Sequence, residues 1–385
     1  MGEVSHGYRT IVGFRREPVP TGPLWPAAAA SQVAVMIPVR SVQVSEGIAF
    51  VFNETTEHGR GPDSVDIREV LPRETWQCQM RYAGLEELWA CTLGYQAKRL
   101  SGNLMPEVLV AGKVFRHLFE VDDVLSTAKA WSTDDGFTGG ELATPKYRVR
   151  RGTAAVWRQV SVWELLSSMI SKMTLTNTLQ DGLLATFEMV AHTRSRASAV
   201  NTAAVLEALA VNANANVLLR HGTLRVAAFS TVTPLGAGDA VKHRDWQIAL
   251  DNHLQAGPGP RTGTAPEEYE RGSAPAVTFA VNLERYRADT DFQRLIGSTA
   301  LMADIKYVGP AIPGTAYNHQ LNIYLPRFHL TDVRSDVAGQ QVPLYSHQAV
   351  MEVPRAAPAG FPVSHHFGPV IVELVNTVST HALLD

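Results

Sequence analysis

The sequence predicts a mainly β protein that consists of two tandem β units with short flanking helices. Alternation of apolar and polar residues dominates the chain, and one order of strand, loop and short helix occurs twice. Gly and Pro gather at 134–145 and 257–275 between strand-like segments, which is typical of long excursions from a sheet. Helical periodicity is confined to short segments near 85–93, 122–130, 197–211 and 289–296.

The chain length and the composition of the N-terminal segment divide the chain into four predicted regions. At roughly 100 to 200 residues per domain, 385 residues favour two or three domains. Arg15 and Arg16 precede an apolar stretch in the manner of a signal peptide, but five prolines between residues 18 and 38 would break a signal helix. We therefore expect an extended arm over 1–38, a first β domain over 39–196, a connecting helix and linker over 197–216, and a second β domain over 217–385.

The two β domains are predicted to be copies of one another. Residues 75–80 read TWQCQM, and 203 residues later residues 278–283 read TFAVNL, so the apolar positions coincide. Three further segments match in the same order, which predicts an internal duplication. The matched residues are Trp89, Leu93 and Gly94 with Phe292, Ile296 and Gly297; Val65 and Ile67 with Trp246 and Ile248; and Leu175 and Phe187 with Leu330 and Tyr345.

Each half is predicted to contain an antiparallel hairpin with one apolar and one polar face. In the strand at 75–82 the apolar set alternates with amide and charged side chains, and the strands at 65–68, 246–251 and 277–284 show the same alternation. The polar faces carry mixed charge and amide groups. Their members are Asp66, Arg68, Gln77, Gln79, Arg81, Gln247, Asp251, Thr278, Asn282 and Glu284.

The composition argues against several function classes. The formal net charge is -3 and only 18% of residues are charged, so the chain lacks the basic surplus of a dedicated nucleic-acid binder. Cys78 and Cys91 are too few for a disulfide framework or a four-thiolate zinc site. No run of about 18 apolar residues is present, so no transmembrane helix is expected.

The sequence offers little catalytic chemistry. It contains no HExxH, no P-loop and no Gly-x-Ser-x-Gly motif. Ser126 and Lys129 match Ser-x-x-Lys without its companion motifs, and Gly236–Asp239 is typical of a turn rather than of a dinucleotide site. His365 and His366 point to opposite faces if they lie on a strand, with no third ligand at useful spacing. We therefore predict no catalytic residues, no metal, no cofactor and no enzyme activity.

With duplicated β halves, an N-terminal arm and long loops, the order of elements resembles the major tail tube proteins of long-tailed bacteriophages, in their double-domain siphophage form. The resemblance covers most of residues 40–380 as a pattern rather than as a sharp motif. The residues that carry it are Trp76–Met80, Leu85–Trp89 with Leu93 and Gly94, Val114–Glu120, Met173–Thr176 and Leu184–Phe187.

The resemblance implies a structural virion protein with tail-tube-type β-sandwich or barrel units. Such proteins form rings that stack into a hollow tube for genome delivery, and double-unit members are trimers with pseudo-sixfold symmetry. The partners are then further copies of this chain, the tape measure, tail terminator and distal tail proteins, and double-stranded DNA that passes without specific binding, with no membrane. The location is the virion tail, assembled in the host cytoplasm.

The same resemblance assigns roles to the polar faces and to the long loops. The polar-face residues named above become candidates for the lumen lining, because a neutral or mildly acidic wall would not grip phosphates. The arm and the loop excursions become candidates for contacts between stacked rings. These residues are Arg15, Arg16, Trp25, Glu57, Arg60, Asp134, Asp135, Arg261, Glu267, Glu268 and Tyr269.

Two other classes of function remain open from the sequence. One is another virion or adhesive β-sandwich protein, such as a tail fibre part or a carbohydrate-binding module, which would show clustered exposed aromatic residues. The other is a β-class enzyme whose acid and base lie far apart in sequence, as in a glycosidase. Equal polar patterning in both halves favours the structural role.

Overall fold

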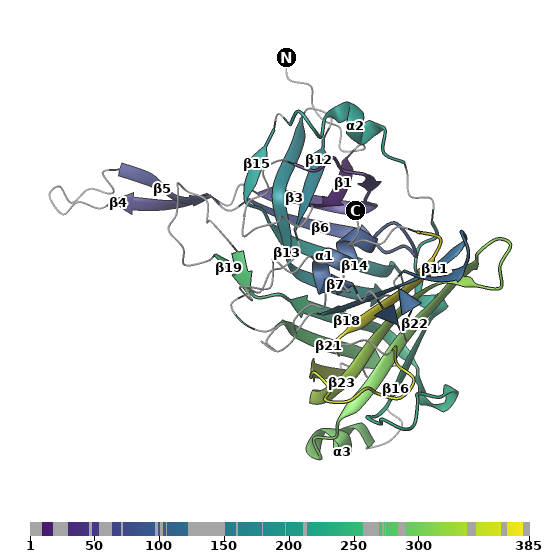
Figure 1. Ribbon diagram of the computed structural model, residues 1–385. Helices are drawn as coiled ribbons and strands as arrows, with labels where there is room; N and C mark the ends of the chain where they lie inside the picture. The colour runs from purple at the N-terminus through teal and green to yellow at the C-terminus, as the bar shows by residue number, and fades with distance from the viewer. Residues whose placement is uncertain are drawn as a thin grey trace.

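The computed structural model confirms a mainly β protein in which antiparallel strands form two layers and helices are short (Figure 1). The structure describes residues 10–17, 30–45, 48–53, 64–70, 72–96, 99–100, 103–104, 106–121, 151–158, 161–178, 180–196, 198–210, 214–256, 269–271, 273, 275–283, 290–336, 344–362 and 368–379. Within these residues, no helix is long and apolar enough to cross a membrane.

The helices and strands follow one another along the chain in a regular order. The elements up to residue 195 are β1 (Ile11–Arg16), β2 (Val35–Met36), β3 (Val39–Ser45), β4 (Ile48–Asn53), β5 (Ser64–Val70), β6 (Arg73–Gln79), α1 (Glu86–Leu93), β7 (Gly94–Gln96), β8 (Arg99–Leu100), β9 (Asn103–Leu104), β10 (Glu107–Val110), β11 (Val114–Val121), β12 (Gly152–Trp157), β13 (Val162–Thr178), β14 (Gly182–Val190) and β15 (Thr193–Ser195). The later elements are α2 (Ala203–Glu207), η3 (Leu219–His221), β16 (Gly222–Ala228), η4 (Ala237–Asp239), β17 (Ala240–Val241), β18 (His243–Asp251), β19 (Leu254–Ala256), β20 (Tyr269–Arg271), β21 (Ala276–Leu283), α3 (Thr290–Ile296), β22 (Leu301–Ala311), β23 (Asn318–Asp336), β24 (Leu344–Met351) and β25 (Ile371–Asn376).

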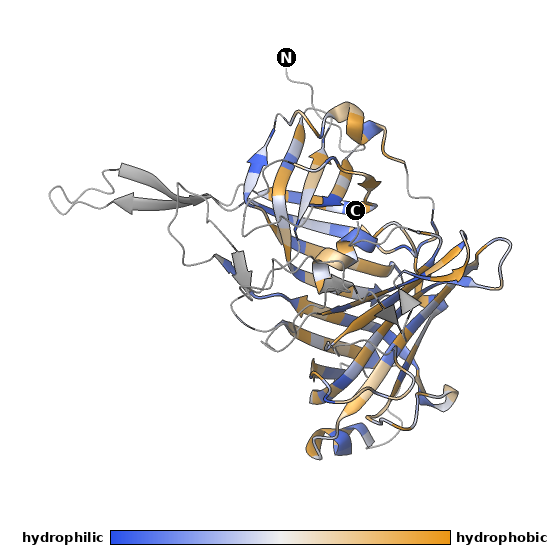
Figure 2. Ribbon diagram, viewed as in Figure 1, coloured by the Kyte–Doolittle hydropathy of each residue, from blue (hydrophilic) through white to orange (hydrophobic). Residues whose placement is uncertain are grey.

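Eight strands form one continuous antiparallel layer, which we call the inner sheet. Their order is β3-β6-β14-β13-β18-β21-β24-β23. Apolar side chains line one face of this sheet and are buried in the main core, as Trp76, Phe187 and Leu250 show. The alternation of apolar and polar positions is visible as orange and blue bands along the strands (Figure 2). Burial of this apolar face is the main force that holds the sheet against its second layer.

The second layer is made of two outer sheets, one for each half of the chain. In the first, β1, β12, the start of β13 and β15 pair side by side. In the second, β16, β22, the start of β23 and β25 do the same. β13 has 17 residues and β23 has 19, so each is long enough to run from its outer sheet into the inner sheet.

The strand pairings repeat between the halves. We call β1 to β15 the first unit and β16 to β25 the second unit. Seven pairings of the first unit recur in the second: β1–β2 and β16–β17, β1–β12 and β16–β22, β12–β13 and β22–β23, β13–β14 and β23–β24, β13–β15 and β23–β25, β14–β6 and β24–β21, and β3–β6 and β18–β21. The same topology in both halves supports the predicted duplication.

β-Bulges fix which residues are equivalent, and they correct the predicted offsets. The β3–β6 bulge leaves Arg40 unpaired and the β18–β21 bulge leaves Arg244 unpaired. Bulges in β13 and β23 likewise lie at Ser171 and Thr331. Equivalent residues of the two units are therefore 204 positions apart in β3 and β18, 205 in β6 and β21, and 160 both in β13 and β23 and in β14 and β24. The predicted offsets were 203 for β6 and 155 for β13. The corrected matches are Trp76 with Val281, Cys78 with Leu283, Ile170 with Leu330, and Phe187 with His347.

The predicted hairpin of the first half is wrong. The strand that carries Val65 and Ile67, β5, pairs with β4 in a separate two-stranded sheet, and β3 pairs with β6 instead. Both β3 and β5 alternate apolar and polar residues, so alternation does not say which of them joins the main sheet. The true counterparts of Trp246 and Ile248 are Val42 and Val44.

Two further features depart from the predicted regions. The arm predicted over residues 1–38 contains β1, which pairs with β12 in the first outer sheet. The strands β7, β10 and β11 follow α1 and have no counterpart among the described residues after α3, and β11 extends the second outer sheet by pairing with β25. The first unit therefore adds strands to the outer layer of the second.

The predicted short helices are confirmed at three of four places. α1 and α3 lie where the pattern placed them, and each ends at the residue before a glycine, Gly94 or Gly297. α2 is shorter than the predicted helix over 197–211, and the Thr202 side chain caps it by accepting a hydrogen bond from the backbone N–H of Val205. The fourth segment, 122–130, lies outside the described residues.

Candidate assembly interface

The inner sheet has two edges along which the described strands have no partner. β3 pairs only with β6, and Leu330–Asp336 of β23 pair only with β24. Between these edges the sheet is continuous. Exposed sheet edges present unpaired N–H and C=O groups and are templates for pairing with another chain, so both ends of the inner sheet are candidate interaction surfaces.

The junction between the units lies inside this sheet, where β13 of the first unit pairs with β18 of the second. The register places Lys172 opposite Asp251, Leu175 opposite Ile248, and Asn177 opposite Trp246. β23 is the counterpart of β13, and β3 is the counterpart of β18. The strands at the two open edges, β23 and β3, are thus equivalent to the two strands, β13 and β18, that already pair within the chain.

The polar face of the inner sheet is nearly neutral. Thr186 of β14, Thr174 of β13, Ala249 of β18 and Thr278 of β21 form one row across it. A second row has alternating charge, since Lys172 lies opposite Glu188 on one side and Asp251 on the other. Opposite charges in cross-strand positions stabilise a sheet modestly. Because the charges of this row largely cancel, the face has no strong electrostatic field.

Five of the ten predicted polar-face residues lie on this face of the inner sheet. Gln77, Gln247 and Thr278 are half-buried or exposed, and Asp251 lies at the end of β18 beside Lys172. Asn282 donates a hydrogen bond to the carboxylate of Asp245 at 2.6 Å. Their side chains therefore form one shared surface, which includes both units.

Two residues of the predicted set instead hold loops in place. Gln79 donates from Nε2 to the carbonyls of Asp181 and Leu183, which fixes the turn between β13 and β14. Arg81 donates to the carbonyl of Asn214 at 3.1 Å, at the linker between the units.

Three other predicted residues are not on the described part of the polar face. Asp66 and Arg68 lie on β5, outside the inner sheet. Glu284 lies outside the described residues.

The predicted ring-stacking residues are only partly described. Arg15 and Arg16 lie on β1; Arg16 is 7% exposed and its backbone N–H donates to Glu87, so its side chain is not a surface group of the monomer. Tyr269 lies on β20, opposite Ala256 of β19. The remaining residues of the set lie outside the described part of the chain: Trp25, Glu57, Arg60, Asp134, Asp135, Arg261, Glu267 and Glu268.

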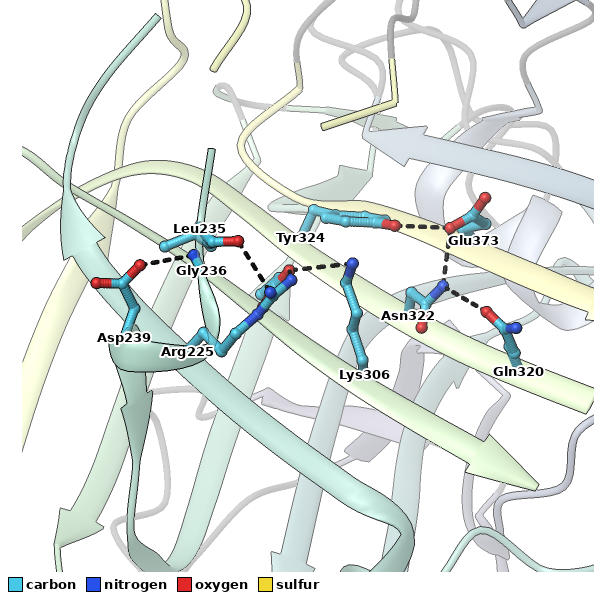
Figure 3. A network of polar contacts seen from close by, with 10 residues as sticks. Arg225, Leu235, Gly236, Asp239, Lys306, Gln320, Asn322, Tyr324 and Glu373 are labelled. Carbon is cyan, nitrogen blue, oxygen red and sulfur yellow. Dashed lines mark hydrogen bonds and ion pairs between the residues drawn. The ribbon is translucent and has the colours of Figure 1, made fainter. Parts of the chain in front are cut away.

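A chain of ion pairs crosses the second outer sheet (Figure 3). Arg225 on β16 donates to Asp304 on β22 at 2.8 Å, and a further guanidinium N–H donates to the carbonyl of Leu235. Lys306 lies 3.4 Å from the same carboxylate, which is 2% exposed. Two cations therefore compensate one buried anion.

A second polar network connects β23 and β25 with the strands that the first unit contributes. Glu373 on β25 accepts hydrogen bonds from Tyr324 at 2.7 Å and Asn322 at 2.8 Å, and pairs with Arg116 of β11 at 3.0 Å. Arg116 pairs in turn with Glu107 at 2.9 Å. Burial, with the neighbouring Glu373, raises the pKa of Tyr324 far above its usual value, so the phenol stays neutral and donates. The network has a structural role, since it holds β11 against the second unit.

Sequence reasoning missed a cationic side chain at one of the open edges. Arg158, in the loop between β12 and β13, donates from Nη2 to the carbonyl of Val42 on β3 at 3.0 Å and lies over the ring of Trp163. It thus occupies a carbonyl of the β3 strand. The two residues are 116 positions apart, and no local pattern signals the contact.

The described residues contain little that suggests catalysis. No group of three or more His, Cys, Asp or Glu in them is arranged to hold a metal ion. A small pocket of about 40 Å³ lies between α3 and the core, and its walls are mostly apolar, with Asp291, Arg294 and His347 as the polar exceptions. No protein-family model and no curated protein sequence matches the chain.

Proposed function

We propose that this chain is a self-assembling structural subunit of the bacteriophage tail tube, forming closed rings that stack into a hollow tube. The observation that carries the proposal is the β13–β18 junction, because the equivalent strands β23 and β3 are left open at the two ends of the inner sheet. A second copy placed head to tail would repeat a pairing that the chain already makes.

Repetition of this contact produces either a ring or an open filament. When two different surfaces of a subunit bind each other, the copies form a closed ring if the rotation between neighbouring copies divides a full turn. Otherwise they continue as an open helical filament. The resemblance to double-domain tail tubes favours closure after three copies, which is six units. Each copy contributes the eight inner strands named above, and closure removes both open edges.

The internal junction predicts the register of the contact between copies. Thr174 lies opposite Ala249 within the chain. With offsets of 160 for β13 and 204 for β3, the equivalent residues are Arg334 of one copy and Ser45 of the next. Both side chains are exposed in the single chain. In the assembled ring, Arg334 of one copy should therefore lie opposite Ser45 of the next copy.

The polar face of the inner sheet suits a passage for DNA. In a closed ring it would face the lumen, because the apolar face packs against the outer sheets. Threonine and amide groups with balanced charge would not hold phosphates, whereas a basic wall would bind them in a salt-dependent way. Tape measure, terminator and distal tail proteins as partners, and location in the virion, follow from the resemblance and belong to the same proposal.

A disulfide between copies tests the register directly. We would combine Arg334→Cys with Ser45→Cys and oxidise the protein at assembling concentrations. Cross-strand neighbours lie about 4.5–5.5 Å apart between Cα atoms, within disulfide range. The native Cys78 and Cys91 are buried and will not compete. We expect covalent multimers that end at a trimer on non-reducing gels, and hollow rings or tubes by negative-stain microscopy.

The matched control pairs Arg334→Cys with Ser41→Cys, which is four residues from the expected partner, or about 13 Å along the strand. This control should give monomers only. Covalent products in the control alone would refute the register, and an unending ladder would refute closure. A compact monomer at every concentration in sedimentation velocity would refute the assembly itself and favour an adhesive or enzymatic β protein.

A further inference from the structure

The equivalent helices of the two units differ sharply in burial. In α1 every residue except Glu87 is buried, with Trp89 at 1% and Leu93 at 0% exposure. In α3 no residue is buried, and the corresponding Phe292 and Ile296 are 47% and 65% exposed. Large apolar side chains that are exposed next to one another mark a candidate interaction site.

The second unit covers both ends of α1. Asn252, directly after β18, donates from Nδ2 to the carbonyl of Thr92 at 3.1 Å. Asn376 of β25 donates to the carboxylate of Glu86 at 2.7 Å. Thus α1 lies at the junction between the units: the second unit contacts its two ends, while its sides pack against β1, β7, β11 and β13 of its own unit.

The position of α3 is equivalent, but no described strand of another unit follows it in the inner sheet. α3 packs against β23, the strand with the open edge, as α1 packs against β13. α1 also contacts β1, whereas the pocket separates α3 from the equivalent β16. Its apolar walls include Leu224, Val226 and Leu330, the last of which lies at the open edge. α3 therefore lies against the strand that carries the open edge.

We infer that the α3 face formed by Phe292 and Ile296 is a docking surface for the first unit of a second copy of this chain. The first unit would contact α3 as the second unit contacts α1, and it would cover the side of α3 that has no equivalent of β7 and β11 in the described chain. The inference rests on the proposed assembly and adds a second contact beside the strand pairing. Such an apolar patch would give the interface a desolvated centre, which strand pairing on a polar face does not provide.

Thiol protection tests the inference separately from the assembly. Ile296→Cys introduces an accessible thiol, since both native cysteines are fully buried. Val232→Cys is the matched control, because Val232 is 84% exposed in the loop after β16. Maleimide labelling rates are measured on monomer and on purified rings. We expect assembly to slow labelling at 296 by at least about tenfold, because the core of an interface excludes solvent, and to leave 232 unchanged.

A charge variant supplies the second measurement. Phe292→Asp with Ile296→Asp should raise the concentration needed for assembly by at least about tenfold while the thermal unfolding of the monomer is unchanged, since both side chains are exposed. Val232→Asp should assemble normally. Rings that form but label at 296 at the monomer rate would overturn the docking inference and leave the proposed function standing. A protein that never forms rings would overturn both.

Discussion

The two units make the same bend with different chemistry. β13 and β23 each pass from the outer to the inner sheet through a bulge in which two residues face one: Leu166 and Ser167 opposite Thr153, and Pro326 and Arg327 opposite Met302. A bulge bends a strand and increases its twist, which suits a strand that changes sheets. Both units thus have the same bulge, but the residue types at its three positions all differ.

In the first unit a buried carboxylate stabilises the bend. Ser167 has a φ of 53°, in the left-handed region that a non-glycine residue seldom adopts. Glu17 is 2% exposed and accepts hydrogen bonds from the Ser167 N–H and Oγ and from Thr153 Oγ1, at 2.7, 2.7 and 2.9 Å. Arg151 lies 3.4 Å from the same carboxylate. The local strain is offset by one charged group.

In the second unit the bend uses proline instead. Pro326 lacks a backbone N–H, and a bulge is one of the few places in a sheet where that donor is not needed. Its fixed φ also lowers the entropy of the unfolded chain. The two units therefore share the strand geometry of the bend but stabilise it with different residues. Equivalent positions should for this reason respond very differently to substitution.

The largest effect is expected at the first bend. Glu17→Ala removes the buried acceptor of three hydrogen bonds and the carboxylate beside the Arg151 guanidinium. We expect this variant to lower the free energy of unfolding by about 3–5 kcal/mol. Urea unfolding measures this. Glu17→Gln, which keeps an acceptor, should recover part of the loss; equal destabilisation by both variants would mean that volume rather than hydrogen bonding matters.

A second difference lies at one equivalent pair of the outer sheets. Arg225 and Asp304 face each other in the second unit where Gly13 and Ala155 pair in the first. Arg225→Met leaves the buried Asp304 with only Lys306, so we expect a loss of about 2–4 kcal/mol in the same assay. Replacing both residues, as Arg225→Met with Asp304→Leu, should restore most of the stability. A double variant as unstable as the single one would contradict this account.

A third difference between the units makes the stability of the protein depend on pH. Glu74 occupies the position equivalent to Phe279, and burial raises its pKa to about 8. The unfolded state ionises near its ordinary value of 4.5, so the stability that neutral Glu74 contributes is complete below that pH and is lost as pH rises toward 8. The slope is about 1.4 kcal/mol per pH unit.

Glu74→Gln should remove this slope. Unfolding measured from pH 4.5 to 8 should show the wild type losing stability relative to the variant across that interval. Phe279→Leu, at the equivalent position, serves as the control and should leave the slope unchanged. Parallel curves for the wild type and Glu74→Gln would show that Glu74 is already ionised in the folded protein.

The smallest effect is expected at the second bend. Pro326→Ala keeps the bulge and loses only the restriction of the unfolded chain, which should cost about 0.4–1 kcal/mol. Thermal unfolding checks this value beside Glu17→Ala. A loss as large as that of Glu17→Ala would show that the two bends are equally strained and would remove the contrast between the units.

The sequence predicted the features that depend on local pattern. Strand alternation, the helices α1 and α3 and the occurrence of two similar units follow from neighbouring residues, and all appear in the structure. Strand partners do not follow from alternation. β5 and β3 have similar patterns, and only the three-dimensional packing selects β3 as the partner of β6.

The missed residues all act over long separations in the chain. Glu17 and Ser167 are 150 positions apart, and Arg225 and Asp304 are 79 apart. A charged side chain in a strand reads as a solvent-facing residue unless its partner is known. The open edges were likewise invisible, because an edge is defined by which strands remain unpaired.

The position of β25 has a consequence for the timing of folding. This strand lies between β23 and β11, and its Asn376 binds the start of α1, so it contacts both units. Every other described strand precedes it in the chain. Because domains fold as they emerge during synthesis, the layers over both units stay incomplete until β25 leaves the ribosome. A nascent chain would thus complete both units together, after all the other described strands have been made.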